Sequence, residues 1–206
     1  TIETNTMEQN KALVASLVER ARAAQAVAEG YSQRRVDELA AALVYTLSRP
    51  ELAQSIAEQA LEETHMGRVD SKIAKLTAKM PSILYDVLPT KTVGIVERLP
   101  EKGIVKVAKP VGVIAALIPS TNPEATPVFK GVLGLRARNA VIFAPHPSSK
   151  ETTRRVVKIM REVLKKNGAP EDLFICIDQP TKELTGELMA QCDLTMATGG
   201  GPMVSA

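Results

Sequence analysis

Cysteine, histidine and aromatic residues are scarce in this sequence. Its 206 residues include two cysteines, two histidines and no tryptophan, and aromatic residues make up only 3%. Two cysteines provide no disulfide framework, which favours a reducing compartment such as the cytoplasm. The histidines, His65 and His146, lie far apart with no further ligand nearby, so we expect no metal site. The few aromatic residues also argue against a stacking surface for single-stranded nucleic acid.

Long apolar runs are absent as well. No segment stays apolar over the roughly 20 residues that a membrane-spanning helix needs, and no signal-peptide pattern follows Thr1. The hydrophobic content of 45% and charged content of 24% suit an ordinary globular protein of one domain or two small ones. A net charge of +3 would suit a nucleic-acid-binding α/β domain, but the basic residues form no stripe. We therefore expect neither a membrane nor a nucleic acid as a partner.

The first 90 residues carry the apolar spacing of helices. Residues 8–29 and 36–47 each form one apolar stripe. The first stripe consists of Leu13, Leu17, Ala21, Ala24 and Ala28. Residues 48–51, with the sequence SRPE, predict a capping box at the start of a third helix, and a fourth helix is expected to end at Pro81. We assign residues 1–90 to an N-terminal helical region.

Two short strand-like runs follow the helices. Residues 92–99 and 104–108 flank a turn with the sequence PEKG, which is short enough for an antiparallel hairpin. We assign residues 91–109 to a β-hairpin arm, for which a plain surface hairpin is the simplest interpretation.

Beyond residue 110, strands and helices alternate, which predicts an α/β fold with a parallel sheet. Residues 111–118 form a near-continuous apolar run typical of a strand covered on both faces, and residues 140–144 repeat the pattern. Polar loops, with the sequences PSTN and PHP, follow these two runs. Because open α/β sheets bind ligands at the carboxyl ends of their strands, we predict a site at this edge.

Three segments resemble the CoA-acylating aldehyde dehydrogenases. They are GVIAALIPSTNP at residues 112–123, RNAVIFAPHPSSK at 138–150 and ATGGGPMVSA at 197–206. Their order and spacing are those of the family, which includes one half of the bifunctional aldehyde-alcohol dehydrogenases and the acylating enzymes of bacterial microcompartments. The resemblance covers essentially the whole chain. It implies an aldehyde-dehydrogenase-like fold, in which helices and an oligomerisation arm lead into a partial Rossmann-like dinucleotide-binding domain, residues 110–206.

The resemblance implies an oxidoreductase that converts an aldehyde and coenzyme A to acyl-CoA with NAD+ or NADP+. It also implies a homo-oligomer in the cytoplasm or inside a microcompartment. In this family, an asparagine in the turn after the first buried strand stabilises the oxyanion together with a backbone N–H at the catalytic cysteine. Asn122 occupies that position. Its sequence alone also suits an Asx turn, because asparagine before proline is common in turns.

The resemblance further implies that turns after four successive strands bind the dinucleotide. By themselves, His146 would be a surface histidine and the glycine-rich segment a plain turn, with neither a GxGxxG fingerprint nor a P-loop. Pro202, directly after the glycines, departs from the family pattern. The implied cofactor-binding residues are Pro119, Ser120, Thr121, Pro145, His146, Pro147, Ser148, Gln179, Pro180, Thr198, Gly199 and Gly200.

Residues 148–151, with the sequence SSKE, predict a second capping box. Exposed N–H groups at the start of that helix would suit ribose or phosphate oxygens. A Glu151 side chain that caps the helix would point at the backbone, so it would not repel a 2′-phosphate on the adenosine ribose. We therefore expect NADP+ to be accepted as well as NAD+.

Neither cysteine matches the family's nucleophile, which lies downstream of the glycine-rich segment. Cys176 falls in a third buried run and Cys192 just before a fourth strand, where free cysteine behaves as a small hydrophobe. We therefore expect the N-terminal part of an enzyme, inactive alone, with most of the acyl pocket beyond Ala206 and the aldehyde undetermined. The alternative is a non-catalytic dinucleotide-binding or oligomerisation module. A cysteine downstream in the open reading frame would decide between the two.

Overall fold

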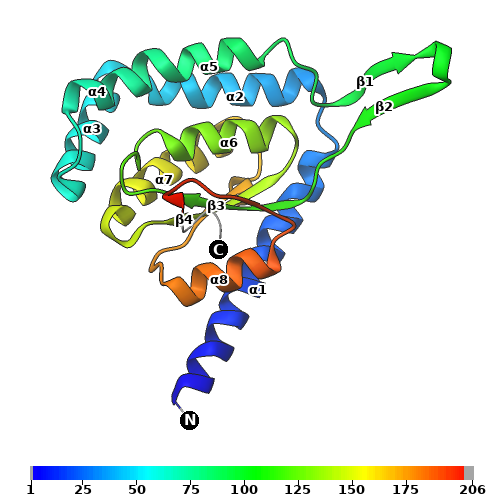
Figure 1. Ribbon diagram of the computed structural model, residues 1–206. Coiled ribbons are helices and arrows are strands. Elements are labelled where there is room, and N and C mark those ends of the chain that lie inside the picture. Colours follow the sequence, from blue (N-terminus) through cyan, green and yellow to red (C-terminus); the bar gives the residue numbers. More distant parts are fainter. Residues whose placement is uncertain (1, 202–206) are drawn as a thin grey trace.

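The structure is a computed structural model that describes residues 2–201, apart from the side chains of residues 2–5 (Figure 1). Pro202 lies outside the described residues. The α-helices are α1 (Ile2–Glu29), α2 (Gln33–Leu47), α3 (Pro50–Thr64), α4 (Val69–Ala74), α5 (Met80–Val87), α6 (Thr126–Arg136), α7 (Lys150–Lys166) and α8 (Lys182–Gln191). The strands are β1 (Gly94–Leu99), β2 (Ile104–Ala108), β3 (Val113–Ile118), β4 (Ala140–Pro145), β5 (Phe174–Cys176) and β6 (Leu194–Met196). A π-helix, η1 (Lys75–Lys79), joins α4 to α5, and short 3-10 turns are η2 (Pro100–Lys102), η3 (Pro147–Ser149) and η4 (Glu171–Leu173).

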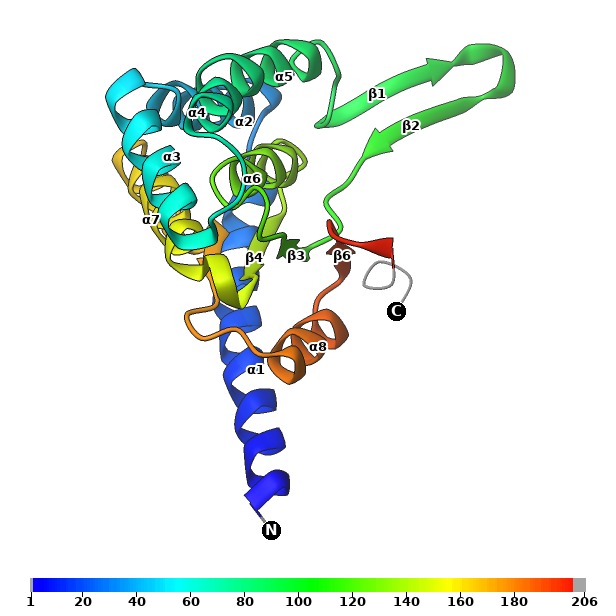
Figure 2. The ribbon, with the colours of Figure 1, turned by 60° about the vertical axis from the view of Figure 1, so that its left-hand side comes forward.

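Helices cover both faces of a parallel sheet, as the sequence predicted. On one face α1 packs against β3, β4 and β5, and α8 lies against α1. On the other face α6 and α7 pack against the sheet, and α2 packs on top of them (Figures 1 and 2). All residues of β3 and β4 are buried, which explains their unbroken apolar sequences. Within residues 2–201, no helix is both long and apolar enough to cross a bilayer.

The four parallel strands have the order β5-β4-β3-β6. The chain moves from β3 through α6 to β4 and through α7 to β5, and then returns through α8 to pair β6 with the other side of β3. The strand order therefore reverses between β3 and β6. The predicted fourth strand is present as β6, but only three of its residues pair with β3, and Leu194 is 45% exposed. Val111 is also exposed and lies outside β3.

Glycines allow α6 to approach its neighbours closely. A Cβ atom built on Gly131 would lie 2.3 Å from the Met160 side chain, and one on Gly134 would lie 2.5 Å from Val141. Real Cβ atoms do not come this close, so larger residues would push α6 away from α7 and β4. Because the loop from β3 leads directly into α6, these glycines also help to place that loop.

The N-terminal helices differ from the predicted ones in three details. Helix α1 begins at Ile2 rather than near residue 8, and Leu13 is 49% exposed because Val14 and Val18 face the core instead. The capping box at residues 48–51 does not form: Arg49 is the N-cap of α3 and makes no side-chain cap bond, although proline does occupy the first turn. Helix α2 buries the predicted face.

The sequence predicted that the fourth helix ends at Pro81, and this prediction is wrong. It continues through α5 because η1 precedes the proline, with the Met80 N–H donating to the carbonyl of Lys75, five residues back. A π turn contains one extra residue per turn, which leaves room for a proline ring that an α-helix would not accommodate. Helices α4 and α5 thereby form one continuous rod with η1 in its middle.

The predicted hairpin is present as the antiparallel pair β1 and β2, with a register shift between Ile95 and Glu97. Both views show it projecting away from the helices and the sheet (Figures 1 and 2). Its turn closes through Gly103, which has a φ of 62°. The arm exposes four large aliphatic side chains: Ile95, Ile104, Val105 and Val107.

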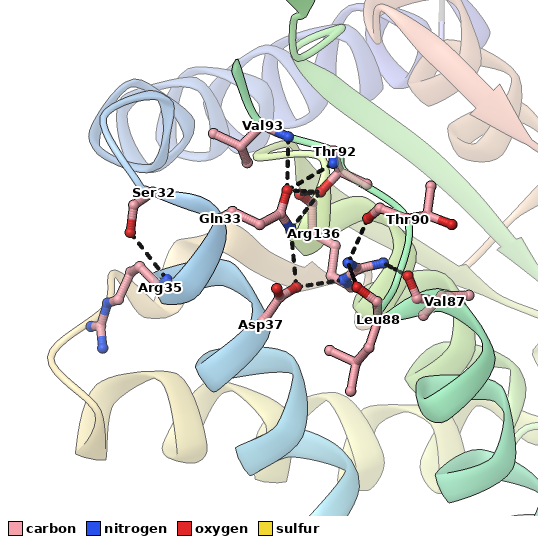
Figure 3. Close-up of polar contacts among 10 residues, drawn as sticks. All are labelled: Ser32, Gln33, Arg35, Asp37, Val87, Leu88, Thr90, Thr92, Val93 and Arg136. Atoms are coloured by element: carbon pink, nitrogen blue, oxygen red, sulfur yellow. Dashed lines mark hydrogen bonds and ion pairs between the residues drawn. The ribbon is translucent and has the colours of Figure 1, made fainter. Parts of the chain in front are cut away.

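A buried arginine holds the segment that leads into β1 of this arm (Figure 3). Arg136, 2% exposed at the end of α6, donates to Asp37 of α2 at 2.8 Å and to the carbonyl oxygens of Val87, Leu88 and Thr90. Gln33 accepts hydrogen bonds from the backbone N–H groups of Thr92 and Val93. The entry to β1 is therefore tied to both α2 and α6.

The segment that leaves β2 is held by residues that follow Arg136 in the chain. Arg138 donates to the carbonyl oxygens of Glu29 and Ala108, at 2.7 and 3.1 Å. The side-chain oxygen of Asn139 accepts from the backbone N–H groups of Val111 and Gly112. Residues 136–139 thus hold both ends of the arm.

We expect Arg136→Met to lower the free energy of unfolding by about 3 kcal/mol, because it leaves a partly buried carboxylate and three carbonyl groups without their cation. Urea unfolding followed by circular dichroism would measure the change. Arg34→Met is the matched control, since Arg34 pairs with Glu38 on the exposed side of α2 and its loss should leave the unfolding midpoint unchanged. Equal midpoints for both variants would contradict the assigned role of Arg136.

Candidate functional site

The predicted site residues gather at the carboxyl edge of the parallel sheet. Residues 119–122 follow β3, residues 145–148 end and follow β4, residues 179–180 follow β5 and residues 198–200 follow β6. The loops after β3 and β6 flank the point where the strand order reverses, which is where open α/β sheets bind ligands. Thr198, Gly199 and Gly200 are exposed, and a Cβ atom on Gly200 would meet no atom within 4 Å. This turn therefore leaves room for a ligand.

Lys130 joins the two strands that flank this reversal. It is 3% exposed on α6, and its ammonium donates to the carbonyl oxygens of Leu117 in β3 and Met196 in β6, both at 2.6 Å. Burial lowers the pKa of Lys130 to about 8. The two carbonyl oxygens favour the charged form, so a cation is held directly beneath the β3 and β6 loops.

Asn122 is half-buried in the loop between β3 and α6. Its backbone carbonyl accepts from the Thr126 N–H, which begins α6. Its side-chain oxygen accepts a hydrogen bond from the ammonium of Lys75 in η1. This bond assigns the orientation of the carboxamide, because only the oxygen can accept. One N–H then faces the Thr121 hydroxyl at 3.2 Å, and the amide keeps a second N–H to donate.

Below Asn122 lies a buried carboxylate between two lysines. Glu124 is fully buried and accepts from Lys72 at 3.2 Å, while Lys75 lies 3.8 Å from its other oxygen. Lys72 is 1% exposed and also donates to the carbonyl oxygen of Thr121. That second Glu124 oxygen is buried and accepts no hydrogen bond, so its interaction with Lys75 is electrostatic only. The cluster fixes η1 and the β3–α6 loop against each other.

A groove of about 320 Å³ runs along this junction. Residues of η1 and α5 supply one wall, and the first half of α6 with its preceding loop supplies the other. The polar lining residues are Lys75, Lys79, Asn122 and Thr126. The apolar lining residues are Met80, Ile83, Ala125 and Phe129.

The loops after β4 and β5 are tied to each other. Lys150 donates to the side-chain oxygen of Gln179 at 2.7 Å. His146 is exposed, and its Nδ1 accepts from the backbone N–H of Ser148 at 3.2 Å, so the ring closes its own turn. Among residues 2–201, no three histidine, cysteine, aspartate or glutamate side chains gather in a metal-binding group.

The capping box predicted at residues 148–151 is wrong. Both oxygens of Glu63, at the end of α3, accept from the first turn of α7: the N–H groups of Glu151 and Thr152 at 2.8 Å and the Thr152 hydroxyl at 2.6 Å. A carboxylate from another helix therefore occupies the helix N-terminus that we expected to be open to phosphate. The Glu151 side chain pairs with Arg154 instead of the backbone. Glu151 therefore gives no reason to expect that NADP+ is accepted.

Neither cysteine is placed to act as a nucleophile. Burial raises the pKa of the Cys176 thiol to about 12 and that of Cys192 to about 11, and a nearby aspartate adds to each shift. Both side chains pack against the hydrophobic core. Their structural role was predicted from the sequence.

The charged residues beneath the site were not predicted from the sequence. Lys72, Glu124 and Lys130 are each nearly or fully buried. A signal was present for Lys130, because it is the single charged residue in a helix of otherwise apolar and small residues until Arg136. Glu63 gave no local signal, since its partners lie 88 and 89 residues away.

The fold of the described residues is that of a known protein family. Residues 3–203 match the model of the aldehyde dehydrogenase family, and the chain belongs to that family. It is 45% identical to the sulfoacetaldehyde dehydrogenase of an Acholeplasma species, over 94% of this chain and 40% of that protein. It is 40% identical to the acetylating succinate-semialdehyde dehydrogenase of Clostridium kluyveri, over 96% of this chain and 43% of that protein. The chain thus spans less than half the length of these relatives.

Solved structures of related enzymes have the same fold as this chain. An acetylating aldehyde dehydrogenase from Geobacillus thermoglucosidasius superposes with a TM-score of 0.89 at 36% identity, covering 97% of this chain and 44% of that one. A propionaldehyde dehydrogenase of Rhodopseudomonas palustris, with bound CoA and an acylated cysteine, gives a TM-score of 0.78 at 27% identity, over 93% and 44% of the two chains. An engineered glycolyl-CoA reductase with bound NADP+ has the same score and identity, over 93% and 43%.

We expect both cysteines to resist alkylation in the folded protein. At pH 8, a thiol with a pKa of about 12 is ionised in roughly one molecule in ten thousand, and one with a pKa of about 11 in roughly one in a thousand. Mass spectrometry after treatment with iodoacetamide should show no adduct at pH 8 and two adducts in urea. Because the thiolate is the reactive form, labelling of the native protein should accelerate about tenfold per pH unit. Rapid labelling of Cys192 at pH 7 would contradict this assignment.

Proposed function

We propose that the full-length protein is a CoA-acylating aldehyde dehydrogenase. An aldehyde, coenzyme A and NAD(P)+ would give acyl-CoA, NAD(P)H and a proton. The observation that carries this proposal is the orientation of Asn122, whose oxygen is engaged by Lys75 so that its amide nitrogen is left to donate. The names of the related proteins support the acylating reaction. Two of them act on aldehydes that end in a sulfonate or a carboxylate.

Asn122 would act as an oxyanion donor. When a cysteine thiolate attacks an aldehyde, the carbonyl oxygen takes up negative charge, and a donor fixed in advance stabilises that charge. The carboxamide is fixed by two contacts, to Lys75 and to Thr121. Lys75 also places a positive charge behind the amide, which strengthens its N–H as a donor. The attacking cysteine would be neither Cys176 nor Cys192.

The turns at the sheet edge would hold the dinucleotide, which supplies the hydride acceptor. Their fit rests on the exposed glycine turn after β6, the exposed turn after β4 and the cation of Lys130 beneath both β3 and β6. We propose Pro119, Ser120 and Thr121 after β3, residues 145–148 after β4, Gln179 and Pro180 after β5, and residues 198–200 after β6 as contacts. Coenzyme A is the second substrate. Either NAD+ or NADP+ fits this proposal.

The hairpin arm would serve as an oligomerisation element. It projects from the body and exposes four large aliphatic side chains, and an arm of this kind is stabilised when a second subunit covers it (Figure 2). We propose a homo-oligomer in a reducing compartment such as the cytoplasm, either free or enclosed in a microcompartment. A non-catalytic module would share the fold but would not turn over any aldehyde with CoA.

We expect Asn122→Ala in the full-length enzyme to lower kcat by about two to three orders of magnitude, the usual effect of removing one oxyanion donor. The Kd for the dinucleotide should change little, because the lost amide faces the aldehyde. Formation of NAD(P)H in the presence of CoA would measure turnover. Asn167→Ala is the matched control, since Asn167 only caps the distant end of α7. A kcat near that of the unaltered enzyme would remove Asn122 from the mechanism.

A further inference from the structure

The groove beside Asn122 carries positive charge and no negative charge. Two of its lining residues, Lys75 and Lys79, are lysines, and none is an acid. The nearby carboxylate of Glu124 is fully buried and already accepts from Lys72. Glu124 thus faces two lysines, Lys72 and Lys75, and Lys79 adds a further positive charge to the groove.

The two groove lysines are differently engaged. The ammonium of Lys75 donates to Asn122 and lies near Glu124. Lys79 makes no hydrogen bond or ion pair within residues 2–201, and its side chain is exposed at the groove. A lysine that lines a groove without a partner is available to an anion.

Their spacing follows from the π-helix. Lys75 and Lys79 are the first and last residues of η1, and both line the groove. On an α-helix the Cβ atoms of residues four apart lie about 5–6 Å from each other, and the two ends of η1 are neighbours on a comparable scale. An aldehyde only a few atoms long, with its carbonyl oxygen at Asn122, would reach Lys79 with its far end. The same groove is also lined by Met80, Ile83, Ala125 and Phe129, which suit a short carbon chain.

Resting on the proposed function, we infer that the substrate is a short aldehyde with an anionic far end, a sulfonate or a carboxylate, and that Lys79 binds that anion. Lys79 is a specificity residue that acts through binding, and Lys75 is a positioning residue for Asn122. The same ammonium could instead meet a phosphate of coenzyme A. The two sources of negative charge are separated by the experiment.

The test uses the full-length enzyme and three aldehydes: 2-oxoethanesulfonate, 4-oxobutanoate and neutral butanal. We expect both anionic aldehydes to be preferred over butanal. Lys79→Gln should lower kcat/KM for the anions by about tenfold, mainly through KM, which is the scale of one partly exposed charged hydrogen bond. It should leave butanal within about twofold. Lys79→Arg should restore most of the loss because it restores the charge.

Lys158→Gln is the matched control, because it removes an exposed lysine of α7 that does not line the groove. It should leave all three aldehydes unchanged. An equal loss for butanal, an unchanged kcat/KM for both anions, or a raised KM for coenzyme A in Lys79→Gln would overturn the inference. The last result would assign Lys79 to the phosphates of coenzyme A.

If the proposed function itself is wrong, the outcome differs from a failure of the anion site alone. In that case no aldehyde, charged or neutral, would support CoA-dependent reduction of NAD+ or NADP+. The anion site would then be tested by calorimetry with propanesulfonate, which cannot react. Binding that weakens about tenfold in Lys79→Gln but not in Lys158→Gln would support the site, and equal binding by both variants would exclude it.

Discussion

A buried guanidinium, that of Arg136, connects α6 to α2 and to the end of α5. Its three carbonyl partners belong to the last turn of α5 and the segment after it, where helix carbonyl groups lack partners of their own. At the other end of the same rod, the buried ammonium of Lys72 binds Glu124 and the Thr121 carbonyl. Two buried cations thus fix both ends of the helical rod that walls the groove. The position of that wall relative to Asn122 depends on both.

The π-helix lies between these two fixed points, and Pro81 follows it directly. Because both ends of the rod are held, the extra residue cannot be absorbed by a shift of either end. Lys75, the first residue of η1, lies against Asn122, and Lys79, its last residue, lines the same groove. A π turn inside an α-helix often marks a functional position, and here it sets which lysines face the site.

The periodic parts of the fold were predictable from the sequence, and the contacts between distant residues were not. The apolar runs of β3 and β4 predicted a parallel sheet because burial on both faces leaves no polar alternation. The position of Asn122 at the sheet edge followed from the motif. The capping box at residues 148–151 does not form because local sequence shows which groups could cap a helix but not that Glu63, from α3, would reach α7. The predicted helix end at Pro81 was wrong for a similar reason. The expectation that proline ends a helix assumes an α-helical turn before it, and here that turn is a π turn.

The weakly paired strand β6 has a consequence of its own. Within residues 2–201 it pairs on one side only, through three residues, and Leu194 is 45% exposed. An open strand edge with an exposed aliphatic side chain is a template for any extended segment that can add to it. Handled by itself, this chain offers the same edge to its own copies, so its behaviour at high concentration would be governed by aggregation through β6 rather than by the stability of its core.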